Sequence, residues 1–193
     1  MNIVIFNGGP SNGRGAASRG IADETERRAR AKGFTVSRFD LAGLDIKPCR
    51  GCFACWVKHP GTCAIKDDEE PILRAMAASD ILLWITPIAF GGYGPTLKKA
   101  LDRSISISLP LFIKVRGEIH HPQRYDKRRS FLVFGTLPSA EAESERIFHN
   151  LVRRNGINLH SVRTESRVLY EGADGAGMTG MVEELLTAAE EAI

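Results

Sequence analysis

Hydrophobic residues along the chain fall into two alternating patterns, short continuous runs and runs with helical spacing. The continuous run Ile3–Phe6 is typical of a parallel strand that is buried on both faces. Runs of the same kind predict four further strands, at Phe34–Phe39, at Asp80–Ile85, at Phe131–Phe134 and within Asn158–Tyr170. Helical spacing between and after these runs predicts helices at Ala16–Lys32, at Pro71–Ala78, from Pro95 onward, around Ile147–Val152 and across Met181–Ala189.

Local signals set the expected ends of several helices. Basic residues gather in the last turns of the first helix, where they suit the helix dipole, and Gly33 then supplies a stop. Pro95 is well placed at a first helical position. The stripe around Ile147–Val152 is expected to end at Asn155-Gly156.

Five strands alternating with five helices predict a doubly wound α/β fold with a parallel sheet and helices on both faces. In such sheets ligands bind at the carboxyl ends of the strands, near the point where the strand order reverses. Three segments are therefore expected at one edge of the molecule: Asn7–Ser18, Thr86–Gly94 and Gly135–Ser139.

Length and composition fit one domain over residues 1–193 of ordinary globular character. The formal charge of +3 is too mild to indicate a nucleic-acid partner. The run Ile3–Phe6 is too short for a signal peptide, and no segment approaches the length of a membrane span. The expectation is a cytoplasmic protein with no membrane partner.

The first of the three segments has the composition of a phosphate cradle. Its glycines let the backbone approach an anion at the start of a helix, and the segment also offers hydroxyls and one arginine: Gly8, Gly9, Ser11, Gly13, Arg14, Gly15 and Ser18. The spacing is neither that of a P-loop nor that of a dinucleotide fingerprint. The alternative is a flexible loop that only connects two elements.

The second segment combines backbone donors with apolar side chains, a combination that suits a flat heteroaromatic ring: Thr86, Pro87, Ile88, Ala89, Phe90 and Gly91. Backbone N–H groups directed at the polar edge of a flavin can stabilise its reduced, anionic form. The alternative is an ordinary glycine turn before a helix.

Four cysteines lie within fifteen residues, at Cys49, Cys52, Cys55 and Cys63. Four thiolates in so compact a run are what a [4Fe–4S] cluster requires. Zinc is an alternative metal, although its sites more often use two separated pairs. The cysteines could also serve as small buried hydrophobic residues, as redox-active thiols or as a disulfide.

The connection Leu111–Arg129 is long for a doubly wound fold. One interpretation is a lid over a flavin, in which a His or Tyr donates a proton and Arg124 meets an acidic substrate or a nicotinamide phosphate. The other is an oligomer interface with a solvated basic tail. The acids of Asp67–Glu70 precede a predicted helix and are explained as favourable charges at its N-terminus.

Several motifs together resemble the NADPH-dependent FMN reductase branch of the flavodoxin-like superfamily. They are Asn7-Gly8-Gly9-Pro10, Ile46-Lys47-Pro48-Cys49-x-Gly51-Cys52-x-x-Cys55-Trp56, Ile65-Lys66-Asp67-Asp68, Thr86-Pro87-Ile88-x-Phe90-Gly91-Gly92 and Gly117-Glu118-x-His120-His121-x-x-Arg124-Tyr125. The compact cysteine motif is also similar to that of the iron–sulfur flavoproteins of the same superfamily. The sequence departs from the usual pattern at Gly9, at Gly15-Ala16 and at Ala89, where the family more often has serine, a polar pair and an aromatic residue.

The resemblance implies a three-layer sandwich with a five-stranded parallel sheet in the order 2-1-3-4-5. It also implies noncovalent FMN, with the phosphate on Gly9–Ser18 and the ring on Pro87–Gly91. The residues expected to bind FMN are Gly9, Pro10, Ser11, Gly15, Ala17, Ser18, Thr86, Pro87, Ile88, Ala89, Phe90, Gly91 and Gly135.

The function that follows from the resemblance is transfer of electrons from NADPH or NADH through FMN to a small acceptor such as a quinone or a flavin, in a homodimer or homotetramer. No catalytic side chain is assigned. Two alternatives stay open. One is an iron–sulfur flavoprotein that carries electrons through a [4Fe–4S] cluster on the four cysteines, and the other is a non-catalytic flavin-binding or zinc-stabilised protein.

Overall fold

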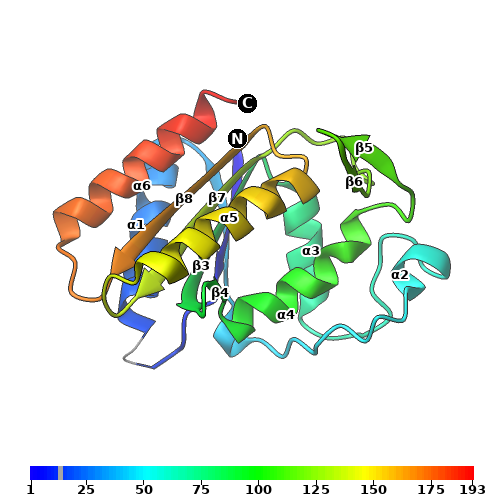
Figure 1. The fold of residues 1–193 in the computed structure, drawn as a ribbon, viewed down its shortest axis with the longest axis horizontal. Helices are drawn as coiled ribbons and strands as arrows, with labels where there is room; N and C mark the ends of the chain where they lie inside the picture. Colours follow the sequence, from blue (N-terminus) through cyan, green and yellow to red (C-terminus); the bar gives the residue numbers. More distant parts are fainter. Residues whose placement is uncertain (13–14) are drawn as a thin grey trace.

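A parallel five-stranded sheet forms the centre of the molecule, in a computed structural model that describes residues 1–12 and 15–193 (Figure 1). The strands lie in the order β2-β1-β3-β7-β8. Their bounds are Thr35–Asp40 for β2, Asn2–Asn7 for β1, Ile81–Ala89 for β3, Ser130–Leu137 for β7 and Arg163–Tyr170 for β8. This order and the parallel pairing confirm the predicted doubly wound fold, with β7 and β8 as its fourth and fifth strands.

Helices cover both faces of the sheet (Figure 1). Two of them, α1 (Ala16–Ala31) and α6 (Gly175–Glu190), lie on one face, and α3 (Glu69–Ala78), α4 (Pro95–Arg103) and α5 (Ala142–Asn158) lie on the other. The two faces follow from the alternation of side chains along each strand. In β1, for example, Ile3 and Ile5 pack in the core under α1 and α6, whereas Val4 and Phe6 pack in the core on the other face.

The segment Thr86–Gly94, expected as a loop, is largely a β-hairpin. Its first half continues β3 as far as Ala89, and its second half contains β4 (Gly92–Tyr93), which pairs with β3 in the antiparallel direction. The described sheet therefore has a sixth, antiparallel strand, whereas five parallel strands were predicted. The turn between the two strands is made by Phe90 and Gly91, both with positive φ, of 51° and 77°. Two consecutive residues of this kind are typical of the tight turns that join antiparallel strands.

The predicted end of the helix around Ile147–Val152 at Asn155-Gly156 is wrong, because this helix, α5, continues to Asn158. Gly156 is buried in the helix, and a Cβ atom there would lie 2.1 Å from Oγ1 of Thr164 on β8. The glycine is therefore present because helix and strand approach closely. It does not mark a helix end.

Smaller elements complete the chain. They are η2 (Leu41–Gly43), α2 (Ala54–Val57), η3 (Ser104–Ile107), β5 (Ile113–Val115) and β6 (Glu118–His120). The last two form an antiparallel hairpin inside the long connection Leu111–Arg129. Among the described residues, no helix is both long and apolar enough to cross a bilayer.

Candidate functional site

The loop after β1 is fixed to both neighbouring strands at its start. The side-chain amide of Asn7 donates to Asp40 Oδ1 at the end of β2, at 2.7 Å, and its Oδ1 accepts the N–H of Gly9 at 3.0 Å. The N–H of Gly8 donates to the carbonyl of Ile85 on β3 at 2.8 Å. The predicted phosphate loop therefore leaves the sheet at the point where the strand order reverses, between β1 and β3.

Arg19 of α1 gathers the carbonyls of this loop. Its Nη1 donates to the carbonyl oxygens of Pro10, Ser11 and Asn12, at 3.4, 3.4 and 3.0 Å. Because one guanidinium offsets the partial negative charges of three carbonyl oxygens, the loop repels a bound anion less.

Two glycines of this loop sit where no larger residue fits. A Cβ atom on Gly9 would lie 2.4 Å from Ser18 Cβ, and one on Gly15 would lie 1.8 Å from the carbonyl oxygen of Pro10. Ser18 is buried beneath Gly9, whereas Ser11 is exposed on the outside of the loop. Gly13 and Arg14, which were also expected to contribute, lie outside the described residues.

The N-terminus of α1, like that of α4, lacks the side-chain cap and the acidic residues that neutralise the starts of the other long helices. Its N-cap residue, Gly15, makes no side-chain cap, and its first turn has no acidic residue. In contrast, α3 and α5 carry acids in their first turns, and Asp174 caps α6 by accepting the N–H of Gly177 at 2.6 Å. The positive end of the α1 dipole and its unpaired N–H groups are thus available to a phosphate, so the residues present fit the phosphate end of FMN.

The hairpin of β3 and β4 starts at the same edge of the sheet. Thr86 Oγ1 accepts the N–H of Gly94 at 2.9 Å, which closes the hairpin at its base. At its tip, a Cβ atom on Gly91 would lie 2.6 Å from Ile147 of α5, so the turn rests on that helix. Phe90 is fully exposed, at 100%. Both the left-handed backbone conformation of Phe90 and the exposure of its large apolar ring to water cost free energy. An exposed ring of this kind suits contact with a flat ligand or a partner.

Other predicted FMN residues occupy supporting positions. Pro87 and Ile88 are half-buried in β3, and Ala89 is exposed. Gly135 is buried within β7, where a Cβ atom would lie 2.5 Å from Cδ1 of Ile88. Gly135 therefore makes room for the Ile88 side chain, and any effect of this glycine on a ligand passes through Ile88.

The four cysteines line one small cavity, of about 30 Å³, together with Arg103 of α4. All four thiols are free; Cys55 is buried and Cys63 half-buried, whereas Cys49 and Cys52 are exposed. Burial raises the pKa of the Cys55 thiol, and the neighbouring Cys63 raises it further. Among the described residues, no three His, Cys, Asp or Glu side chains converge as they would around a single metal ion.

Arg103 fixes both ends of the cysteine segment. It is fully buried and donates to the carboxylate of Asp67, to the carbonyl of Lys47 at 3.2 Å and to that of Ile65 at 3.3 Å. Asp67 in turn accepts the N–H of Lys47 at 2.9 Å. Although burial opposes it, the hydrogen bond from Arg103 lowers the pKa of Asp67, which therefore stays ionised.

Glu69 differs from the expectation that the acids of Asp67–Glu70 serve only the helix dipole. Its side chain is completely buried, and neither carboxylate oxygen has a hydrogen-bond partner among the described residues. Burial raises its pKa to about 8, despite the opposing charge of Arg103. The sequence did contain a signal that Glu69 is buried. Glu69 precedes the buried Ile72, Leu73 and Met76 by three, four and seven residues, a spacing that places it on the same face of α3.

The connection Leu111–Arg129 does not cover the predicted flavin loops of its own chain. His120 of β6 is buried and bonds to Asn158, at the C-terminal end of α5, at 2.8 Å, whereas the hairpin tip rests on Ile147 near the start of that helix. Arg124 donates to the carbonyls of Ser106 and Ser108. Its guanidinium therefore holds η3 in place.

The strand order and the position of the loops at the switch point define a flavodoxin-like α/β fold. The sequence profile of the NADPH-dependent FMN reductases matches residues 1–117, and the chain belongs to this family.

Known relatives include iron–sulfur flavoproteins. One from Methanocaldococcus jannaschii is 36% identical over 90 residues, which are 46% of this chain and 46% of that protein. One from Methanosarcina thermophila is 29% identical over 105 residues, 54% of this chain and 53% of the relative. The matched part thus spans about half the length of these curated relatives.

Solved structures with the same fold cover nearly the whole chain. An NAD(P)H:quinone oxidoreductase from Methanothermobacter marburgensis superposes with a TM-score of 0.68 at 15% identity, over 98% of this chain and 97% of the other. An FMN-dependent NADH-azoreductase from Bacillus anthracis, in complex with FMN, has a TM-score of 0.62 at 11% identity, over 99% of both chains. At such identities the likeness establishes the fold alone.

Proposed function

We propose that the chain is an FMN-dependent oxidoreductase that takes electrons from NADH or NADPH and passes them to a small acceptor, such as a quinone or a flavin. The observation that carries the proposal is the uncapped start of α1 beside the loop that Arg19 organises. Family membership and the activities for which the quinone oxidoreductase and azoreductase relatives are named support it. Residues 1–193 act as one FMN-binding domain in this proposal.

The FMN phosphate is assigned to the backbone of Gly9–Ser18 and to the first turn of α1, where helix N–H groups point outward. The isoalloxazine ring is assigned to Pro87–Gly91, with Phe90 as an exposed aromatic neighbour. When bound, FMN supplies the chemistry that accepts a hydride and releases electrons singly or in pairs. The chain's own residues bind and orient it, and no described side chain at this edge is assigned as an acid or base.

The direct test has two parts. FMN is titrated into apoprotein, and NADH or NADPH oxidation is then followed with a quinone, an azo dye and free FMN as separate acceptors. Stoichiometric FMN binding with turnover of at least one donor–acceptor pair supports the proposal. Bound FMN without turnover of any pair contradicts the enzymatic part and leaves a flavin-binding protein, and failure to bind FMN contradicts the whole.

A second candidate function is electron transfer through a [4Fe–4S] cluster on Cys49, Cys52, Cys55 and Cys63. The observation that favours it is that all four thiols line one cavity. The cavity has room for about one water molecule, so a cluster requires the two exposed cysteines, Cys49 and Cys52, to move outward. Iron and acid-labile sulfide in a ratio near one, in protein purified without oxygen, would establish it, whereas their absence would rule it out.

We also propose a cytoplasmic homodimer or homotetramer. Exposed apolar side chains support self-association, notably Leu111, Phe112 and Ile119 around the β5–β6 hairpin and Phe90 at the β3–β4 turn. The mass in solution, measured by light scattering with and without FMN, tests the oligomer, and a monomer in both states contradicts it.

A further inference from the structure

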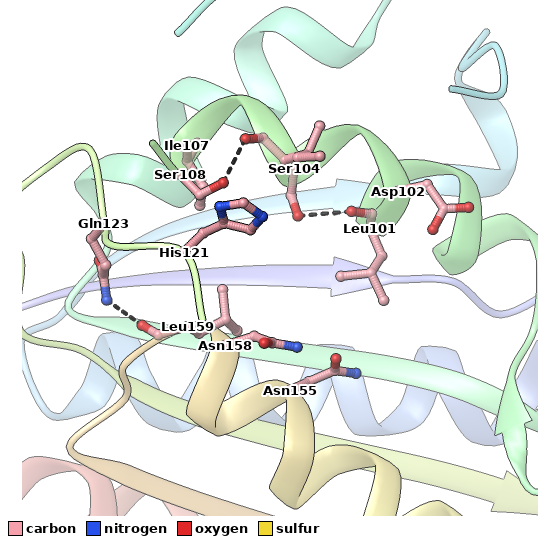
Figure 2. A pocket seen from close by; sticks show the side chains of 11 residues that line it. Leu101, Asp102, Ser104, Ile107, Ser108, His121, Gln123, Asn155, Asn158 and Leu159 are labelled. Atoms are coloured by element: carbon pink, nitrogen blue, oxygen red, sulfur yellow. Dashed lines mark hydrogen bonds between the residues drawn. The ribbon is translucent and has the colours of Figure 1, made fainter. Parts of the chain in front are cut away.

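A cavity of about 310 Å³ lies between α4 with η3 on one side and the end of α5 on the other. Figure 2 shows the His121 ring between the side chains of η3 and those of Asn158 and Leu159. The volume lies at the lower end of the range of small-molecule sites, and it suits a compound of one or two rings.

This cavity is separate from the predicted flavin loops. Those loops lie at the N-terminal ends of α1 and α4, whereas the cavity adjoins the C-terminal end of α4, nine residues or about 14 Å further along. One contact links the two places, because Asn155 of the cavity wall donates to the hydroxyl of Tyr93 on β4 at 2.8 Å. On the other side, Ile105 lines both this cavity and the cavity of the cysteines.

Four polar side chains that line this cavity donate hydrogens to backbone carbonyls. Ser104 Oγ donates to Leu101 at 2.7 Å and Ser108 Oγ donates to Ile105 at 2.9 Å. Nδ1 of His121 lies 2.8 Å from the carbonyl of Leu111, so it must carry the hydrogen, and the amide nitrogen of Gln123 donates to Leu159. Figure 2 shows the two serine bonds and the glutamine bond as dashed lines.

These bonds leave several acceptors on the four side chains, beside the second N–H of the Gln123 amide. The two serine oxygens keep lone pairs, a neutral His121 ring keeps one on Nε2, and Oε1 of Gln123 has no partner among the described residues. Because a carbonyl fixes each group, neither the imidazole tautomer nor the glutamine amide can be reversed without losing a bond. A ligand that brings O–H or N–H groups can therefore pair with these fixed acceptors.

The His121 ring is held rigidly. Its centroid lies 4.8 Å from that of Trp56 and 5.0 Å from that of Phe112, and the Trp56 indole N–H donates to the carbonyl of Ile105 at 3.0 Å. The remaining walls are aliphatic, with Leu101, Ile107 and Leu159 among them. Apolar walls with a few fixed polar atoms are the usual composition of a ligand site.

We propose that this cavity binds a flat, uncharged aromatic molecule that carries hydroxyl or amino groups at its edge. The rings lie against the aliphatic walls, and an O–H or N–H of the ligand donates to Nε2 of His121 or Oε1 of Gln123. The site does not depend on the FMN proposal, because none of its residues belongs to the flavin loops.

The test compares 2-naphthol with 2-methoxynaphthalene, which share their rings and differ in the one O–H. Binding to the protein as purified is measured by equilibrium dialysis at pH 8, where imidazole side chains are ordinarily uncharged. We expect 2-naphthol to bind at least about tenfold more tightly, the equivalent of one hydrogen bond. His121→Phe keeps an aromatic ring and removes the acceptor, so it should abolish this preference, whereas His149→Phe on the outer side of α5 should preserve it.

Ser104→Leu fills the cavity and should lower the binding affinity of both compounds by a similar factor. Equal affinity of the two compounds for the wild-type protein would overturn the proposal. So would binding that neither His121→Phe nor Ser104→Leu changes, because the compounds would then occupy another place, such as the flavin loops. Thermal unfolding of each variant identifies a loss of fold, and if His121→Phe is unfolded, the Ser104→Leu result decides.

Discussion

Arg103 and Asp67 form a completely buried ion pair, with side chains that are 1% and 2% exposed. Arg103 comes from the end of α4 and Asp67 from the segment before α3, so the pair joins the cysteine segment to the helical layer. The free energy needed to remove both charges from water is recovered only while both remain paired.

Replacing Arg103 with Met should therefore destabilise the protein by about 3–5 kcal/mol, since the Asp67 carboxylate is then buried without a counterion. The double variant Arg103→Met/Asp67→Leu should recover part of this loss. Urea unfolding measures the free energies. Arg74→Met, which breaks the exposed pair with Glu70, is the matched control and should cost less than about 1 kcal/mol. Equal losses in the two single arginine variants would contradict the buried-pair argument.

Glu69 should make the protein less stable as the pH rises. Burial raises its pKa to about 8 in the folded state, whereas the ordinary pKa of a glutamate, expected in the unfolded chain, is 4.5. Between these values the folded state binds the extra proton, so stability is full below about pH 4.5 and is lost as the pH rises toward 8. Glu69→Gln removes this proton uptake and should gain about 3–4 kcal/mol relative to wild type between pH 5 and pH 8.

Unfolding by urea at a series of pH values tests the Glu69 prediction. The quantity compared is the difference between the two proteins at each pH, so that other titrating groups cancel. Glu70→Gln, on the exposed side of the same helix turn, is the control, and its smaller effect should have the opposite sign, since hydrogen bonding to Arg74 lowers the pKa of Glu70. A pH-independent difference for Glu69→Gln would show that its carboxyl is ionised in the folded state.

The pattern of apolar residues was sufficient to predict the five parallel strands and their two-sided burial, because a parallel strand such as β1 requires apolar side chains on both faces. The strand order followed from the family resemblance. The apolar pattern was insufficient where one residue serves a contact between elements. Gly156 resembles a helix stop in sequence, and only the approach of Thr164 from β8 shows that it is an interior packing position. The hairpin β5–β6 was also missed, since its strands are three residues each and face solvent with Ile113 and Ile119.

Within the candidate site, the sequence identified the two segments that meet at the switch point but not the residues that organise them. Arg19 is one of many arginines in the chain, and its three carbonyl partners are set by the path of the loop. His121 was treated as part of a lid or interface, and its place in a cavity depends on ring contacts with Trp56 and Phe112. Contacts between side chains so distant in sequence leave no periodic signal.

Gly156→Ala should destabilise the protein by about 1–3 kcal/mol, because the added methyl group would overlap Thr164 of β8. Gly180→Ala in α6, with nothing within 4 Å of the new Cβ, is the matched control and should be neutral or stabilise by up to about 1 kcal/mol. Adding Thr164→Ala to Gly156→Ala should recover part of the loss, as measured by urea unfolding. A Gly156→Ala variant as stable as wild type would show that β8 can shift to accommodate the added methyl group.

Ala16→Asp tests the role of the α1 start without weakening the helix. The residue is exposed and lies in the first helical turn, where a carboxylate is favourable to the helix dipole by about 0.3–1 kcal/mol. The same carboxylate repels a phosphate bound at these N–H groups. FMN affinity should therefore fall by at least about tenfold while thermal stability of the apoprotein is kept or raised. Ala31→Asp, exposed at the opposite end of α1, carries the same charge change away from both flavin loops and should leave FMN affinity unchanged. Because the two variants have the same net charge, only the position of the added carboxylate can make their FMN affinities differ. Equal FMN affinities, measured by fluorescence titration, would contradict the assignment of the FMN phosphate to the start of α1.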